Sequence, residues 1–468
     1  MSDNHYDLVI IGGGPAGYAA ALYAGAGGLS VALVERDKVG GTCLHRGCIP
    51  AKELLETAAV HRTVADAAEF GVLAGAPQLD FAITQARKQR IVDGLANGVS
   101  GLLARRKVAI LAGTGRLGPG RTVSVEALDG STTTVTAERV VLAAGSVPRS
   151  IPGFDVDGTV VLTSDEVLSM NEIPGRAAVI GGGAIGCEFA SMMADLGSEV
   201  TILEYAPQIV PGVDADIGKL LARAFARRGI GVRTGVQVTG HTPQPGGGTR
   251  VHLDGGDDID VDVVVVSVGR RPFADLLGLE GTGVVTDQRG FVAVDEFCRT
   301  GEPGVYAMGD LVNTPQLAHV GFAEAILVVK DILDEDPMPI DYDKVPWAIY
   351  CHPEVAFAGM TEEQARDAGL DVIVSKHRFT GNSRAMIVNE TEGMVKVIAL
   401  KEADGRAGRI LGVHMMGPWV TEQLGQGYLA VNWEATVDEV AAFIQPHPTL
   451  SELFGETILD LTGRALHG

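Results

Sequence analysis

"YDLVIIGGGPAGYAAALYAGAGGLSVALVERD", residues 6–37, is the stretch of sequence that decides the fold. An apolar run predicts a strand, three glycines predict a sharp turn, an alanine-rich run predicts a helix, and a second apolar strand ends at Glu35. The spacing Gly12-x-Gly14-x-x-Gly17, between a strand and a helix, is typical of a turn that holds the pyrophosphate of a dinucleotide. Glu35 would then accept hydrogen bonds from a ribose of that dinucleotide.

The same pattern recurs in "RAAVIGGGAIGCEFASMMADLGSEVTILEYA", residues 176–206, which contains Gly181, Gly183, Gly186 and the acidic residue Glu204. The first glycine and the acidic residue are 23 positions apart in both copies. One such turn could exist without a ligand, but two matching copies favour two dinucleotide sites on two doubly wound α/β units. At a nicotinamide site, the Glu204 carboxylate would repel a 2′-phosphate and accept from a 2′-hydroxyl, which favours NAD over NADP.

The composition limits the domain count and the partners. With 468 residues the chain is too long for one ordinary core, so we expect about two to four domains. Its 37 Lys and Arg against 59 Asp and Glu give a formal net charge of −22, whereas nucleic acids and anionic membranes are bound by clustered basic residues. No apolar run approaches the roughly 20 residues of a membrane span. We expect a soluble cytoplasmic protein with no nucleic-acid partner and no membrane partner.

Two of the five cysteines lie close together in "GGTCLHRGCIPAK", residues 40–52. In a reducing cytoplasm structural disulfides are rare, so Cys43 and Cys48 are expected to be catalytic, redox-active or metal-binding. A zinc site would need about four ligands, and Cys187, Cys298 and Cys351 each stand alone, so we expect no metal. The spacing therefore favours a redox pair.

The position of Cys48 supports the same interpretation. It directly precedes a helical pattern, and the positive end of a helix lowers the pKa of a thiol and favours the thiolate. A nicotinamide and a thiol pair each exchange two electrons, and a flavin can exchange electrons with both. We therefore expect a redox pair beside a flavin.

The rest of the chain gives a coarser division. Residues from about 51 to 106 have a helical pattern, and short β-rich segments then lead to "VVLAAGSVPRSIPG", where Pro148, Pro152 and Gly153 mark a crossing between domains. "GVYAMGDL" predicts a strand that ends near Asp310. From about residue 346, strands followed by helices predict an α+β domain.

Three features together resemble the pyridine nucleotide-disulfide oxidoreductases over nearly the full length. They are the cysteine segment, the paired glycine motifs and "HPTLSE", which begins at His447. The resemblance implies FAD at the first glycine motif and NAD at the second. It also implies an FAD-binding domain in two parts, 1–149 and 271–345, an NAD-binding domain, 150–270, and a domain, 346–468, that forms a homodimer.

The resemblance implies roles for individual residues. Cys43 would exchange with the substrate, and the thiolate of Cys48 would face the flavin. Lys52 would lie near the flavin, paired with Glu188, although both could instead be surface charges. Asp310 would bind the ribityl chain of FAD. The remaining cofactor contacts that we expect are Gly115, Ala144, Gly145, Ser146, Val238, Gly269, Gln316, Leu317, Ala318 and His319.

His447 is the base that the resemblance implies, reaching the cysteines of the other subunit. Thiol–disulfide exchange moves protons, and histidine titrates near neutral pH. For Glu452 two interpretations stay open. It could orient His447 and stabilise its protonated form, or it could cap a helix by binding a backbone N–H in a capping box with Thr449.

Within the family, the sequence favours oxidation of dihydrolipoamide to lipoamide, with NAD as acceptor. The first helix lacks the basic residues expected of a glutathione reductase, and no second redox pair lies near the C-terminus. Expected partners are dihydrolipoamide or the lipoyl domains of 2-oxo acid dehydrogenase complexes. An NAD(P)H-dependent quinone or small-disulfide reductase and a non-enzymatic flavoprotein subunit are alternatives. His45 and Arg46 depart from the family pattern, and Arg46 could favour an anionic disulfide or lie on the surface.

Overall fold

The first glycine turn lies in a parallel sheet built around the strand that leads into it. In the computed structural model, which describes residues 4–467, β1 (His5–Ile11) pairs in parallel with β2 on one side and β6 on the other. The parallel order is β3-β2-β1-β6-β17, and β5 and β4 extend the sheet from β6 in antiparallel fashion. The other strands of this sheet are β2 (Val31–Glu35), β3 (Ala109–Ala112), β4 (Thr114–Gly118), β5 (Thr122–Glu126), β6 (Thr132–Leu142) and β17 (Val305–Ala307).

The helices of this first unit pack on one face of its sheet. Helix α1 (Pro15–Ala26) follows the glycine turn directly, because Pro15 suits the first helical position. It packs against α8 (Ala318–Ile332), which comes from a distant part of the chain. Since β17 and α8 follow the whole second unit in sequence, two separate chain segments build the first unit.

The second glycine turn lies in a second parallel sheet, with order β11-β10-β9-β15-β8. Its strands are β8 (Val161–Leu162), β9 (Arg176–Ile180), β10 (Glu199–Glu204), β11 (Gly231–Thr234) and β15 (Val263–Val266). Its helices are α5 (Ser164–Val167), α6 (Ala184–Asp195) and α7 (Ala215–Arg227). A small antiparallel sheet joins the same unit through β12 (Val238–Pro243), β13 (Thr249–Leu253) and β14 (Ile259–Val261). Both predicted strand–turn–helix–strand units are therefore present.

The expected helical stretch between the cysteines and residue 106 is interrupted, which corrects the prediction. Helix α3 (Cys48–Ala65) and helix α4 (Phe81–Arg105) are separated by a short 3-10 turn and by 71–80, which contains no helix. Gly71 has a left-handed backbone with φ of 76°, which ends the first helical segment. Helix α4 begins only where the Asp80 side chain caps it by accepting from the Ile83 N–H.

Two connections between the units run side by side. Strand β7 (Ser146–Pro148) leaves the first unit, β16 (Arg270–Pro272) returns to it, and the two pair in antiparallel fashion. We propose to divide the chain at these connections, with an FAD-binding part at 1–149 and 271–345 around an NAD-binding part at 150–270.

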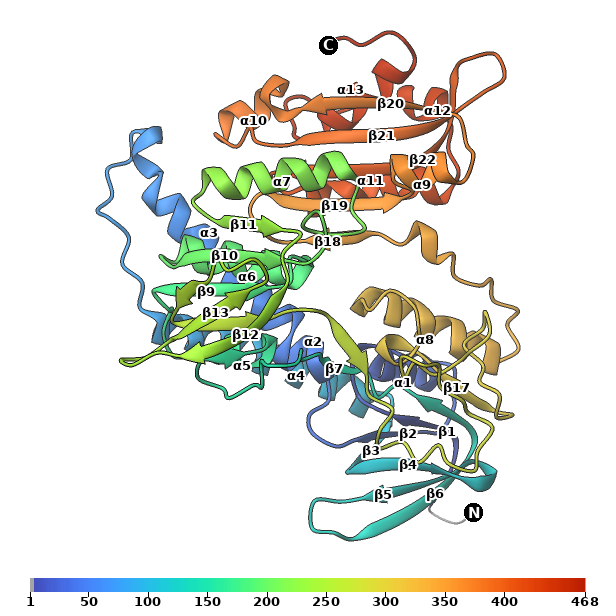
Figure 1. The fold of residues 1–468 in the computed structure, drawn as a ribbon. Coiled ribbons are helices and arrows are strands. Elements are labelled where there is room, and N and C mark those ends of the chain that lie inside the picture. The colour runs from blue at the N-terminus through green and yellow to red at the C-terminus, as the bar shows by residue number, and fades with distance from the viewer. Residues whose placement is uncertain (1–3, 468) are drawn as a thin grey trace.

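The C-terminal part is the expected α+β arrangement. Its antiparallel sheet has the order β18-β19-β22-β21-β20. The strands are β18 (Trp347–Ile349), β19 (Glu354–Gly359), β20 (Val372–Arg378), β21 (Met394–Lys401) and β22 (Ala407–Gly417). The helices are α9 (Glu362–Asp367), α10 (Ser383–Ile387), α11 (Val420–Asn432), α12 (Val437–Ala441) and α13 (Glu452–Leu461). Figure 1 shows α7 of the second unit alongside this sheet, with the first unit at the far end of the molecule.

The hydrophobic core follows the three parts of the fold. Strands β1 and β2 are buried along most of their length because helices cover one face of their sheet and the β4–β6 extension and nearby loops cover the other. The largest apolar cluster joins α3, the second unit and the C-terminal sheet. Among the helices of residues 4–467, none is long and apolar enough to cross a membrane. The expected fold class, two doubly wound α/β units plus a C-terminal α+β domain, is confirmed.

Candidate active site

One large cavity, of about 2200 Å³, lies where the two parallel units and the C-terminal sheet meet. Among its lining residues are most of the predicted site residues, which come from all three parts of the chain. They are Gly12, Gly14, Glu35, Cys43, Cys48, Lys52, Gly115, Ala144, Gly145, Ser146, Gly181, Gly183, Glu188, Glu204, Val238, Gly269, Asp310, Gln316, Leu317, Ala318 and His319.

The first glycine turn is shaped for close approach to a ligand. A Cβ on Gly12 would lie 2.2 Å from the Ala143 carbonyl oxygen, and one on Gly17 would lie 1.8 Å from the Gly12 carbonyl oxygen. At Gly14, by contrast, a Cβ would meet nothing within 4 Å, so this position is open toward the cavity. Gly17 does not line the cavity; its role is to let α1 pack closely on β1.

The second turn repeats this geometry. A Cβ on Gly181 would lie 2.5 Å from the Ser267 carbonyl oxygen, and one on Gly186 would lie 1.9 Å from the Gly181 carbonyl oxygen. Gly183 is again open, and Gly186 again lies outside the cavity lining. Both turns therefore fit the pyrophosphate of a dinucleotide against a helix N-terminus.

Each acidic residue of the two motifs lies under its own glycine turn. The Glu35 carboxylate accepts the Gly13 N–H at 2.6 Å and the Asp37 N–H at 2.8 Å. The Glu204 carboxylate accepts the Gly182 N–H and the Ala206 N–H, both at 2.6 Å. These bonds fix the two carboxylates at the cavity wall, where each could accept from a ribose hydroxyl.

The cysteine pair spans the junction of two helices. Cys43 lies in the short helix α2 (Gly41–Arg46), and Cys48 is the first residue of α3, as predicted. Cys43 and Cys48 are not joined by a disulfide in this structure, and their thiol groups are in contact. This contact and the charge of Lys52 lower the pKa of Cys48 to about 7, whereas the same contact and burial raise the pKa of Cys43 well above its ordinary value. The directions of these two pKa shifts favour Cys48 over Cys43 as the thiolate of the pair.

The charge beside Cys48 is held by a contact between α3 and α6. Lys52 Nζ lies 2.8 Å from both carboxylate oxygens of Glu188, so the two are paired in the cavity wall and are not free surface charges. Burial opposes the charge of Lys52, but the Glu188 carboxylate outweighs it and raises the pKa of this lysine. The lysine thus stays cationic beside the thiolate.

Tyr350 completes this arrangement, and sequence reasoning missed it. Its backbone N–H donates to Glu188 Oε1 at 2.9 Å, and its ring centre lies 4.9 Å from Lys52 Nζ. Tyr350 directly follows β18, in the C-terminal part, so no local pattern connects it with the cysteine segment.

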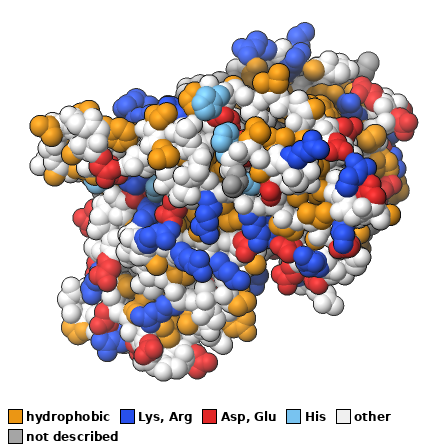
Figure 2. Space-filling model, turned by 90° about the horizontal axis from the view of Figure 1, so that it is seen from above, with side chains coloured by type: hydrophobic (Ala, Val, Ile, Leu, Met, Phe, Trp, Pro, Cys, Tyr) orange, Lys and Arg blue, Asp and Glu red, His pale blue; other side chains and the backbone are white. Residues whose placement is uncertain are grey.

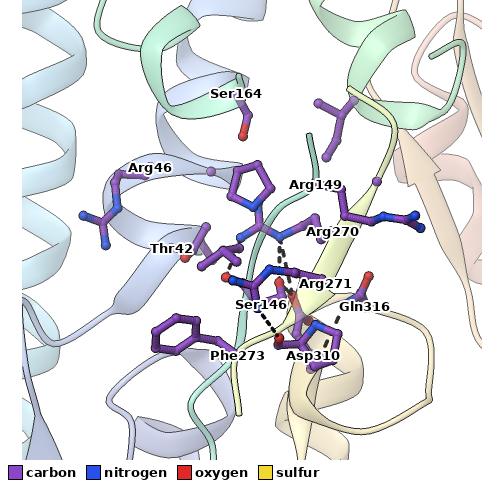
Figure 3. Close-up of a pocket in the computed structure, with 18 of the residues that line it drawn as sticks. Thr42, Arg46, Ser146, Arg149, Ser164, Arg270, Arg271, Phe273, Asp310 and Gln316 are labelled. Atoms are coloured by element: carbon purple, nitrogen blue, oxygen red, sulfur yellow. Dashed lines mark hydrogen bonds and ion pairs between the residues drawn. The ribbon is translucent and has the colours of Figure 1, made fainter. Parts of the chain in front are cut away.

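A second polar cluster surrounds Asp310. Ser146 donates its hydroxyl proton to Asp310 Oδ2 at 2.5 Å, and Arg270 donates to the Ser146 hydroxyl and carbonyl oxygens, both at 2.7 Å (Figure 3). Gln316 donates to the Asp310 carbonyl oxygen at 3.4 Å. Arg270 was not predicted as a site residue, although it directly follows Gly269 in the sequence.

The charges that line the cavity differ from those of the whole chain. Eight Lys and Arg residues line it against six Asp and Glu residues, in a chain whose net charge is −22. The basic ones are Arg36, Lys38, Arg46, Lys52, Arg149, Arg270, Arg271 and Arg289. Figure 2 also shows Lys and Arg side chains gathered across the middle of one face of the molecule. A cavity of this charge suits ligands that carry phosphates.

His45 and Arg46, which depart from the family pattern, make local contacts. His45 Nε2 lies 2.9 Å from the Val39 carbonyl oxygen. Arg46 pairs with Asp37 at 2.9 Å, with both side chains nearly half exposed. In Figure 3 the Arg46 side chain points away from the other labelled residues. This placement favours a surface charge over a clamp for an anionic disulfide.

His447 and Glu452 lie apart from the cavity, on the C-terminal part of the chain. The side chain of His447 is 72% exposed and does not line the cavity. Its Nδ1 lies 2.8 Å from Glu452 Oε1, while Glu452 Oε2 accepts the Thr449 N–H at 2.6 Å. The capping box is only half formed, because among the hydrogen bonds of the described residues the Glu452 N–H does not donate to the Thr449 hydroxyl, which itself donates to the Pro446 carbonyl oxygen. Glu452 thus makes both contacts at once: one carboxylate oxygen lies against His447, and the other accepts the backbone N–H of Thr449.

Known proteins match the chain over its whole length. The profile of the family described as pyridine nucleotide-disulphide oxidoreductase matches residues 6–325, and the profile of that family's dimerisation domain matches residues 345–458. The chain is 42% identical to dihydrolipoyl dehydrogenase of Bacillus subtilis, with 99% of each chain covered, and 39% identical to dihydrolipoyl dehydrogenase 3 of Pseudomonas putida, with 98% and 99% covered.

Solved structures agree. The structure of LpdA from Mycobacterium tuberculosis superposes with a TM-score of 0.90 at 25% identity, covering 98% of this chain and 99% of that one. The HOCl-induced flavoprotein disulfide reductase RclA from Escherichia coli superposes with a TM-score of 0.86 at 28% identity, covering 97% and 99%.

Proposed function

This chain belongs to the pyridine nucleotide-disulphide oxidoreductases, and on that basis we propose that it oxidises dihydrolipoamide to lipoamide and reduces NAD. Its cofactors are FAD and NAD. The observation that carries the proposal is the thiol–thiolate pair of Cys43 and Cys48, in the wall of a cavity that also contains both dinucleotide turns. Bound FAD would take two electrons from the reduced pair and pass them as a hydride to NAD.

The residues that would hold the cofactors are those of the two glycine turns. For FAD these are the first turn, Glu35, and the cluster of Ser146, Arg270 and Asp310. For NAD they are the second turn and Glu204, whose carboxylate would accept from a ribose hydroxyl and repel a 2′-phosphate. The open positions at Gly14 and Gly183 support these assignments.

The exchange with substrate begins from the oxidised pair. One thiol of dihydrolipoamide loses its proton, and its sulfur attacks Cys43, so that the Cys43–Cys48 bond breaks and Cys48 leaves as a thiolate. The second substrate thiol then loses its proton, and its sulfur closes the lipoamide disulfide. Cys43 leaves and takes up a proton. The raised pKa of Cys43 and the lowered pKa of Cys48 support this distribution of protons.

Two groups assist these steps in the proposal. The Lys52 cation, held by Glu188, stabilises the Cys48 thiolate after it leaves. A histidine takes up the substrate protons one at a time, passes one of them to Cys43 as it leaves and releases the other to solvent, and we assign this role to His447 with Glu452 beside it. Because His447 is exposed and lies outside the cavity of its own chain, we infer a homodimer in which His447 of the partner subunit serves each cysteine pair.

The partners follow from the same proposal. We expect the substrate to be dihydrolipoamide, free or carried on the lipoyl domains of 2-oxo acid dehydrogenase complexes, and we propose the cytoplasm as the place of action. Arg46 lines the cavity near the cysteines but is already paired with Asp37, so we expect it to bind the carboxylates of a peptide such as glutathione only weakly.

The experiment that tests the substrate is stopped-flow mixing of the oxidised holoenzyme with dihydrolipoamide or with glutathione, with NAD or NADP as acceptor. We expect dihydrolipoamide with NAD to give the highest kcat/KM. Cys43→Ser and Cys48→Ser should each abolish thiol-linked turnover but leave NADH able to reduce the flavin. Glutathione turnover equal to that with dihydrolipoamide would indicate a small-disulfide reductase. In a separate assay with NADH and a quinone, turnover of the quinone without any thiol-linked turnover would indicate a quinone reductase.

A further inference from the structure

A row of side chains crosses the whole C-terminal sheet in direct register. Trp347 on β18 is paired with Phe357 on β19, Phe357 with His414 on β22, His414 with Lys396 on β21, and Lys396 with Lys376 on β20. The three aromatic rings are stacked, with centroids 5.7 Å apart at each step. Trp347 also lines the cavity, so the row leads from the cavity wall to a buried lysine.

Lys396, the fourth residue of this row, binds the second unit. The side chain of Lys396 is 2% exposed, and its ammonium lies 2.9 Å from Asp214 and 2.7 Å from Asp216 at the start of α7. Glu362 of α9 is its third partner, at 2.8 Å. Asp214 is equally buried, so this ion pair is shielded from water and depends on both partners being present.

Asp214 ends the segment 205–214, which wraps the second glycine turn. The Val210 N–H donates to the Gly182 carbonyl oxygen at 2.6 Å, and the side chain of Ile209 fills the space beside Gly182. Tyr205 and Pro211 of this segment line the cavity next to Glu204. A continuous set of contacts therefore runs from Lys396, through Asp214 and this segment, to the turn that would hold the NAD pyrophosphate.

We propose that Lys396 is a positioning residue for NAD, acting from the C-terminal part of the chain on the dinucleotide site of the second unit. The inference rests on the proposed function for the identity of the ligand. The ion pair fixes one end of segment 205–214, and the contact with Gly182 fixes its middle. Binding to a segment that is already ordered loses less conformational freedom, so the pair increases the affinity for NAD.

The test compares three variants of the holoenzyme. Lys396→Met removes the cation, and Asp214→Asn removes its partner's charge but can still cap α7. Lys401→Met is the matched control, since Lys401 lies on the same strand and, within residues 4–467, pairs only with the exposed Asp371. The readouts are the dissociation constant of NAD by titration calorimetry, the flavin content, and the rate at which dihydrolipoamide reduces the cysteine pair.

We expect Lys396→Met and Asp214→Asn each to weaken NAD binding about tenfold. Because both substitutions break the same ion pair, the double variant should bind NAD about as tightly as the single variant with the lower affinity. Flavin content and the rate with dihydrolipoamide should stay as in the wild type, and Lys401→Met should change nothing. Wild-type NAD affinity in folded Asp214→Asn would overturn the proposal, as would an equal loss of both half-reactions. If Lys396→Met does not fold, the NAD affinity of Asp214→Asn alone tests the proposal. A wild-type protein that binds no NAD would refute the proposed function itself.

Discussion

At the scale of single residues, the chemistry depends on the charge next to Cys48. The Cys43 thiol is the main cause of its low pKa, the Lys52 cation lowers it further, and the Glu188 carboxylate raises it. Lys52 and Glu188 thus shift the pKa of Cys48 in opposite directions. Substituting each residue in turn can distinguish the two effects.

We predict that Lys52→Met moves the first deprotonation of the reduced pair from near pH 7 upward by about one unit, because the thiolate loses its cation. Glu188→Gln should move it downward. At pH 7 the first variant therefore holds less thiolate than the wild type and the second holds more. The ultraviolet absorbance of the thiolate against pH measures both shifts, with the exposed Lys219→Met as the control. Shifts of the same sign would show that the charges do not act on Cys48 directly.

Glu452 gives the second prediction at this scale. Glu452→Gln can still accept the Thr449 N–H, but it has no charge to stabilise a protonated His447. We expect an almost unchanged melting temperature and a turnover at least about tenfold lower, equivalent to roughly 1.4 kcal/mol of barrier. The measurement is steady-state turnover from about pH 6 to 9, together with the melting curve. A folded, dimeric variant as active as the wild type would leave Glu452 with a capping role only.

The residues that the sequence predicted and those it missed differ in a physical way. Cys43, Cys48 and the glycines belong to local motifs, whose spacing itself reflects the turn or helix that they form. Tyr350 and Arg270 act through contacts between parts of the chain that are far apart in sequence. Such contacts depend on how the domains pack, and no spacing along the chain records them.

At the scale of elements, the two strand–turn–helix units were predictable because the first and last glycine of each motif leave no room for a Cβ. The break between α3 and α4 was missed because the helical pattern continues on both sides of it. The interruption is nevertheless marked in the sequence by the helix breakers Gly71, Gly75 and Pro77, and Asp80 then caps the next helix.

The second glycine turn gives a prediction for an element. Gly186→Ala would place a Cβ 1.9 Å from the Gly181 carbonyl oxygen, so α6 must move away from β9. We expect it to destabilise the second unit by about 3 kcal/mol. Gly183→Ala meets no protein atom within 4 Å, and its φ of −73° suits alanine, so it should fold normally but lose NAD binding.

Melting temperature and NAD titration calorimetry, both on the holoenzyme, measure this pair of variants. The prediction requires that stability and binding separate: Gly186→Ala melts lower, whereas Gly183→Ala melts as the wild type but binds NAD weakly. Normal NAD binding by Gly183→Ala would show that the open side of the turn does not face the dinucleotide.

At the scale of the whole molecule, the cavity is built where three parts of the chain meet. His447, the proposed base, does not line it. The cysteine pair, Lys52 and both dinucleotide turns line one cavity, whereas His447 is exposed on the C-terminal part of the chain. The family resemblance supplied this expectation; neither the spacing of the motifs nor the fold of one chain could. It leads to a prediction about two chains.

If His447 of the partner subunit serves each cysteine pair, two inactive variants should restore activity to each other. A heterodimer of Cys48→Ser with His447→Asn has one complete site, formed by the cysteines of the second chain and the histidine of the first. Random pairing of equal amounts makes half of the dimers heterodimers, so we expect about a quarter of wild-type turnover, against almost none for either homodimer. Differently tagged chains, co-expressed and purified by both tags, should reach about half, since one of the two sites is then complete in every dimer. If His447 instead served the cysteines of its own chain, each chain would lack one essential group and the purified heterodimer would be as inactive as its parents.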